Sequence, residues 1–107
     1  MTIREIKEII AIAKVTAQNN TEITIATRAD EALRTGIHTA ELIKSLGKCP
    51  DMNTDFDGWD AWKSDYNELA KKRARYDGIL AVCLEAMGQD YNEIQDVIVT
   101  ATYNKEI

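Results

Sequence analysis

The acidic stretch NTDFDGWDAWKS carries the oxygen-bearing side chains that calcium prefers as ligands. Asn53, Asp55 and Asp57 stand at positions one, three and five of an EF-hand-type loop. Gly58 stands at the turning position six, but Ser64 occupies position twelve, where a bidentate glutamate is needed. We therefore expect no bound metal and interpret the aspartates as acidic residues at the start of a helix, where the helix dipole favours them.

The single histidine and the two cysteines are the other residues that invite chemistry. His38 and Glu41 have the three-residue spacing by which one helix presents two ligands of a carboxylate-bridged metal site, but no second motif supplies the remaining ligands. Cys49 and Cys83 lack a CxxC spacing, so we expect reduced thiols and no zinc. Without a phosphate loop or a nucleophile motif, the sequence predicts neither an enzyme nor a cofactor-binding protein.

A long row of apolar and aromatic residues follows the acidic stretch. Its members alternate at steps of three and four, which places them on one face of a helix. They are Trp62, Tyr66, Leu69, Arg73, Tyr76, Leu80, Cys83 and Met87. Such a row usually belongs to a hydrophobic core. Arg73 is the exception, because a charge in this position must find a carboxylate, reach solvent or meet a partner.

The two halves of this row have different expected roles. The half from Ile79 to Met87 is expected to be buried core, whereas the half from Trp59 to Tyr76 is a candidate interface, because Trp, Tyr and Arg dominate binding hot spots. The basic stretch KKRAR lies on the same helix and is expected to form a solvated face. The candidate binding residues are Trp59, Trp62, Tyr66, Lys72, Arg73, Arg75 and Tyr76.

Helices are the elements that must position these residues. Residues 2–18 are predicted to form an amphipathic helix, with Thr2 and Glu5 as a capping box and with Ile9 and Ile12 widening its apolar stripe. A second helix is predicted over residues 28–46, and a third over residues 59–87. Thr27 and Asp30 together resemble a cap for the second helix, which Gly47 ends, and Gly88 ends the third.

The last helix is predicted to begin at DYNE, with Tyr91, Ile94, Ile98 and Ala101 facing inward. Residues 22–27 and 97–103 are rich in β-branched residues and suit a short strand as well as a helix; for the first we favour a helix. The expected fold is all-α, a small antiparallel bundle of about four helices in a single domain of residues 1–107.

Composition limits the function. A net charge of −5 argues against a dedicated nucleic-acid binder, and the acidic residues near the N-terminus and the short apolar runs argue for a soluble, cytoplasmic chain without a membrane segment. We expect a protein that binds another protein, or a second copy of itself, as an accessory or inhibitory factor of the type that phages and mobile elements encode. The alternative is a protein that holds an anionic small molecule or nucleotide near Arg73 and the KKRAR face.

Overall fold

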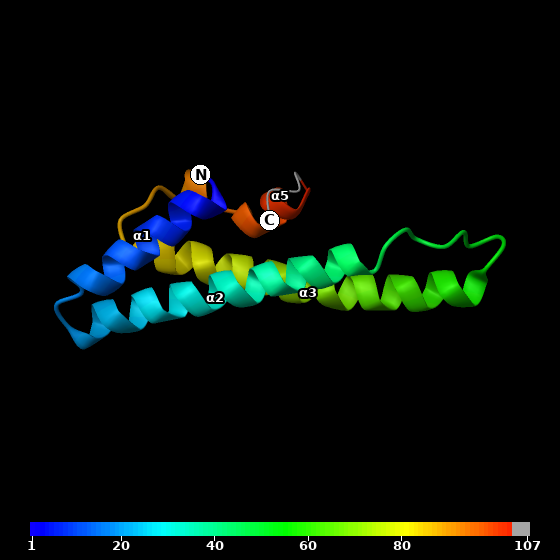
Figure 1. The fold of residues 1–107 in the computed structure, drawn as a ribbon, viewed down its shortest axis with the longest axis horizontal. Coiled ribbons are helices and arrows are strands. Elements are labelled where there is room, and N and C mark those ends of the chain that lie inside the picture. Colours follow the sequence, from blue (N-terminus) through cyan, green and yellow to red (C-terminus); the bar gives the residue numbers. More distant parts are fainter. Residues whose placement is uncertain (104–107) are drawn as a thin grey trace.

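Two long helices joined by a loop form the frame of the fold. The computed structural model describes residues 1–103 and consists of α1 (Ile3–Thr16), α2 (Asn20–Ser45), α3 (Phe56–Ala86), α4 (Tyr91–Ile94) and α5 (Val97–Tyr103). Helices α2 and α3 run antiparallel, and α1 and α5 lie against one part of this pair (Figure 1). The predicted all-α bundle is confirmed, and no strand occurs within residues 1–103.

The first helix has the predicted start. The Thr2 hydroxyl oxygen accepts a hydrogen bond from the Glu5 backbone N–H at 3.2 Å, as an N-cap should. Its apolar stripe is narrower than predicted, because Ile12 is 63% exposed. At about 100° per residue, Ile12 lies roughly 150° around the helix from the buried Ile6 and Ile10 stripe.

The second helix begins eight residues before the predicted start. Asn19 is the N-cap, and its side-chain oxygen accepts from the Glu22 backbone N–H at 2.9 Å. The predicted cap formed by Thr27 and Asp30 is therefore wrong, whereas the preference for a helix over residues 22–27 is confirmed. The reason is tertiary, since the fully buried Ala26 packs inside the bundle and outweighs the β-branched neighbours that favour a strand.

The predicted last helix is divided in two. Ile94 belongs to α4, and Ile98 and Ala101 belong to α5; all three are buried as predicted, whereas Tyr91 is 49% exposed. The break lies at Asp96, whose backbone φ of 56° is left-handed and cannot continue a helix. The predicted glycine stops do hold, because Gly47 and Gly88 have φ of 69° and 93°.

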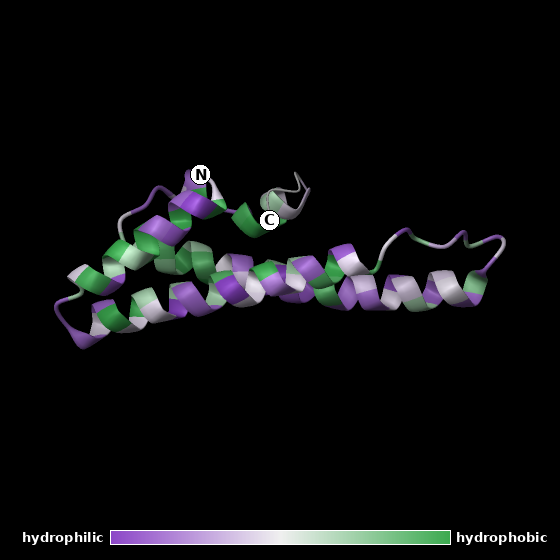
Figure 2. Ribbon diagram, in the orientation of Figure 1, coloured by the Kyte–Doolittle hydropathy of each residue, from purple (hydrophilic) through white to green (hydrophobic). Residues whose placement is uncertain are grey.

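The core occupies only one end of this elongated molecule, which measures 58 × 23 × 20 Å. The largest fully buried apolar side chains, Ile6, Leu33, Leu80, Leu84, Ile94 and Ile98, all lie where α1, α4 and α5 cover the pair of long helices. Figure 2 shows the most hydrophobic segments gathered at this end. Between residues 41 and 76 no side chain is buried. We call residues 41–76 the arm, and residues 1–40 and 77–103 the body.

Candidate functional site

The arm contains every candidate binding residue of the predicted interface. Five of them form the half-buried row: Trp59, Trp62, Tyr66, Arg73 and Tyr76. The other two, Lys72 and Arg75, are exposed. The row continues toward the body of the molecule as the buried Leu80 and Cys83, so one helical face changes from half-covered to buried along its length. Whether the arm residues bind a partner stays a prediction.

Aromatic side chains order the outer part of the arm. The rings of Trp62 and Tyr66 are stacked, with centroids 5.0 Å apart and planes 9° apart. The Trp62 indole N–H donates to the Gly47 carbonyl at 3.3 Å, which ties α3 to the end of α2. Phe56 and Trp59 form a second, tilted pair at 5.8 Å. Sequence reasoning missed Phe56, although it stands three residues before Trp59 and extends the same helical face.

The first turns of α3 extend beyond the end of α2. Trp62 reaches the last turn of α2 through Gly47, and residues 56–61 lie farther out, where only the connecting loop runs beside them (Figure 1). We call residues 56–61 the tip. Phe56 in the tip is 58% exposed, and Met52 in the loop is 46% exposed. The tip therefore carries large apolar surface that the described chain leaves open to solvent.

The α2 side of the arm adds apolar residues. Leu42 is 38% exposed, and Ile43 and Leu46 are half-buried. Leu42 and Leu46 line a shallow groove of about 260 Å³ together with Leu69 of α3. A pair of helices covers only one face of each member, and stable bundles add a third or fourth helix. The body has these added helices in α1 and α5, and the arm has none within residues 1–103.

The exposed charges of α3 change sign along the arm. The outer part carries the acidic residues Asp57, Asp60, Asp65 and Glu68. The KKRAR stretch follows and, apart from the half-buried Arg73, its charged side chains are exposed as predicted. No ion pair joins these charges within the described residues, where the ion pairs meet at Asp30 instead. The arm is thus acidic at its outer end and basic toward the body.

Arg73 marks the border between arm and body. Its Nε is buried and makes no hydrogen bond to a described residue, and the same is true of Oδ2 of Asp77, one turn farther along α3. Burial raises the pKa of the Asp77 carboxyl, while the backbone N–H groups of Ile98 and Val99 and the charge of Arg73 lower it. Arg73 therefore lies near a carboxylate without an ion pair to it and keeps part of its side chain at the surface.

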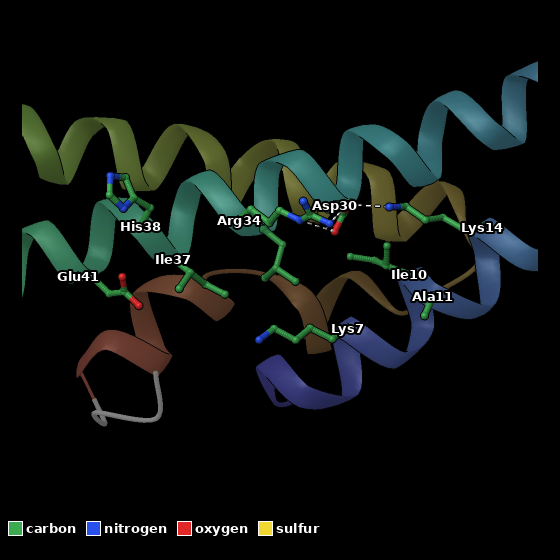
Figure 3. Close-up of a pocket in the computed structure, with 10 residues that line it drawn as sticks. Lys7, Ile10, Ala11, Lys14, Asp30, Arg34, Ile37, His38 and Glu41 are labelled. Carbon is green, nitrogen blue, oxygen red and sulfur yellow. Dashed lines mark hydrogen bonds and ion pairs between the residues drawn. The ribbon is translucent and has the colours of Figure 1, made fainter.

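A second concave region lies on the body, between α1 and α2. This cleft of about 520 Å³ has Ile10, Leu33 and Ile37 among its apolar walls. Asp30 accepts from the Lys14 ammonium at 2.6 Å and from the Arg34 guanidinium at 2.9 Å across its rim (Figure 3). Lys14 holds the pKa of the Asp30 carboxyl below its usual range. Sequence reasoning missed this cleft, because its charges come from separate helices.

The chemically inviting residues are placed apart from one another. His38 and Glu41 line the same cleft, but no third metal-binding side chain joins them in the described part of the chain. Asp55 caps α3 by accepting from the Gly58 N–H at 3.0 Å, so the second half of the calcium-like motif is helical and cannot wrap an ion. Cys83 is buried, which raises the pKa of its thiol.

No protein-family model, curated protein or solved structure matches the chain significantly. Within residues 1–103, no helix combines the length and the apolar character needed to cross a lipid bilayer. The arm, with its half-buried aromatic row and its divided charge, is therefore the candidate functional site.

Proposed function

We propose that this protein acts by binding another protein through the arm, as an accessory or inhibitory factor of the kind that phages and mobile elements encode, in the cytoplasm. One observation carries the proposal: the arm has no buried side chain although its two helices present a continuous aromatic and aliphatic row. A partner that covers this row would remove apolar surface from water at about 25 cal/mol per Å².

The composition of the row supports a binding surface rather than an unfinished core. Trp59, Tyr66 and Arg73 belong to the three residue types that most often dominate interface energies. The ring stack of Trp62 and Tyr66 and the hydrogen bond of Trp62 to Gly47 hold the surface in a defined shape before any partner arrives. A surface that is ordered in advance loses less conformational entropy on binding.

Site-specific photo-cross-linking in the producing cells tests this proposal. A photoreactive amino acid replaces Phe56, which is 58% exposed in the tip, or Val15, which is 86% exposed on α1 as the matched control. We expect a discrete protein adduct from position 56 and none from position 15. The substitution Trp59→Ala should abolish the adduct from position 56. Equal labelling from both positions, or no adduct from position 56, would contradict the proposal.

A second candidate function, the holding of an anionic small molecule, has one observation in its favour. Arg28 and Arg75 line a cleft of about 270 Å³ beside Tyr76. Glu31 in the same cleft offsets part of their charge. Isothermal titration with inorganic phosphate and with ATP tests this candidate, and binding that Arg75→Ala abolishes and Lys63→Ala leaves unchanged would support it. No heat of binding for either probe would exclude it.

A further inference from the structure

The outer end of the arm carries most of the net charge of the chain. Residues 51–65 contain five aspartates and one lysine and therefore have a charge of −4, whereas the whole chain has a charge of −5. The remainder of the protein is thus close to neutral. A charge concentrated at one end attracts partners of the opposite sign to that end, and it repels anionic ones such as nucleic acids and acidic lipid surfaces.

Helix stability accounts for only some of these aspartates. Asp55 is the N-cap of α3, and Asp57 stands in its first turn, where the helix dipole favours acidic residues. This effect falls off within the first turn, and Asp60 and Asp65 lie beyond it. Aspartate is also a poor helix former. No ion pair within residues 1–103 involves Asp60 or Asp65, whose side chains are exposed, so their charges are available to a partner.

Asp60 borders the exposed aromatic surface of the tip. At about 100° per residue, Phe56 lies between Trp59 and Asp60 around the axis of α3, about 60° from the first and about 40° from the second. Asp57 follows about 60° farther on, on the side away from Trp59. Phe56 and Trp59 form a tilted ring pair, and Phe56 is 58% exposed. Aromatic rings and carboxylates therefore share one face of the tip, which extends past α2 (Figure 1).

We infer, resting on the proposed binding function, that the tip binds a basic segment of another protein, in which lysine or arginine stands beside a large apolar side chain. The apolar side chain packs on Phe56, and the cation lies against Asp57 and Asp60. Burial of the aromatic surface supplies most of the affinity in such a contact. The charges at its border set which partner is accepted and how fast it associates.

Photo-cross-linking of tips with altered charge tests this inference. The purified chain, with a photoreactive amino acid at position 56, is added to an extract of the producing cells. Asp57→Asn/Asp60→Asn keeps the shape of both side chains and removes two charges, and we expect the yield of the adduct to fall about tenfold. Glu8→Gln/Glu85→Gln removes the same charge from exposed positions of the body and should leave the yield unchanged. An equal loss in both variants, or a loss in neither, would overturn the inference.

Lys63 allows a test of the opposite sign. It is the one basic residue among residues 51–65, it is exposed, and it lies about 20° from Phe56 around the axis of α3. Lys63→Gln should raise the yield of the adduct about threefold, because it removes a charge that repels a basic segment. Raising the salt from about 0.1 M to about 1 M shortens the Debye length from about 10 Å to about 3 Å and should lower the yield. A lower yield from Lys63→Gln would contradict the inference.

The partner segment in the adduct gives the most direct readout. Mass spectrometry locates the residue that is joined to position 56. Within about two helical turns of that residue, we expect lysine and arginine to outnumber aspartate and glutamate and a large apolar residue to be present. An acidic or neutral segment overturns the inference and leaves the proposed binding function standing. The absence of any adduct from position 56 contradicts both.

Discussion

The Asp77 carboxylate on α3 accepts a hydrogen bond from the backbone N–H of Ile98 at 3.1 Å, across a separation of 21 residues. Ile98 stands in the first turn of α5, whose amide groups have no partner inside their own helix. Asp77 therefore caps the start of α5, although it lies on another helix and an N-cap residue normally stands directly before the helix that it caps. This contact fixes where α5 docks, and so it fixes where the covered body ends and the open arm begins.

Replacing Asp77 should destabilise the fold in proportion to the hydrogen bonding that is lost. Asp77→Ala leaves the buried Ile98 amide without an acceptor, and we expect a loss of about 1 to 3 kcal/mol in the free energy of unfolding. Asp77→Asn keeps an acceptor oxygen and should lose less. Urea unfolding of the three proteins measures the difference, and equal stability of Asp77→Ala and the parent would show that α5 does not depend on this cap.

The same carboxyl predicts a pH dependence. Burial raises the pKa of Asp77 above its ordinary value near 3.8, more than the N–H groups of Ile98 and Val99 lower it. The unfolded chain ionises first, so the stabilising contribution of the protonated group is complete below pH 3.8 and is lost as the pH rises through the raised pKa. Relative to Asp77→Asn, the parent should lose stability as the pH rises above about 4 and through the raised pKa of Asp77. A difference that stays constant across this window would contradict the assignment.

Close packing at Gly36 should respond to paired substitutions. A methyl group on this buried residue of α2 would collide with Cδ1 of Ile98, which is itself fully buried. Gly36→Ala should cost about 1 kcal/mol or more, although alanine favours a helix, because the overpacked core must shift. Adding Ile98→Val removes Cδ1, and the double variant should be more stable than Gly36→Ala alone. If the double variant loses as much free energy of unfolding as the two single variants together, the collision with Ile98 does not cause the loss in Gly36→Ala.

Substitutions on the two halves of the α3 row should separate stability from binding. Leu80 is fully buried, and Leu80→Ala should cost about 2 to 5 kcal/mol. Trp59 lies in the tip, so Trp59→Ala should change the stability of the monomer by about 1 kcal/mol at most while it removes the cross-link from position 56. Melting curves taken at matched low concentrations provide the comparison. A Trp59→Ala variant as unstable as Leu80→Ala would assign the arm to the core.

Local sequence rules explain which features could be predicted. Thr2, Gly47 and Gly88 act through the backbone of their immediate neighbours, and the predictions for these three residues are confirmed. The start of α2 also has a local signal, since Asn19 and Glu22 are spaced as a cap, but the β-branched residues that follow them favour a strand and obscured it. The break at Asp96 precedes a contact with another helix, in which Asp77 of α3 accepts from the Ile98 N–H, and local sequence rules contain no signal for such a contact.

The sequence predicts which face of α3 the row occupies, but it does not predict where along the row the buried part ends. The three-four spacing identifies the face of α3 that meets α2, and Trp62 and Leu80 occupy it equally. What distinguishes them is the added packing of α4 and α5 against α3, with α5 docked at Gly36 and Asp77. The aromatic composition predicts an interface at Trp59 to Tyr76. This segment lies outside the core, and its role in binding stays a prediction.

Hydrogen–deuterium exchange along α3 tests the binding role of the arm most directly. In the isolated, dilute chain, amides of residues 56–76 should exchange faster than those of residues 77–86, because α4 and α5 pack against the latter part of α3. In the complex isolated from cells, whether with a second copy or with another protein, the amides of residues 56–76 should be slowed about tenfold or more, and those of α1 should be unchanged. Protection that appears on α1 while residues 56–76 exchange as before would contradict the account.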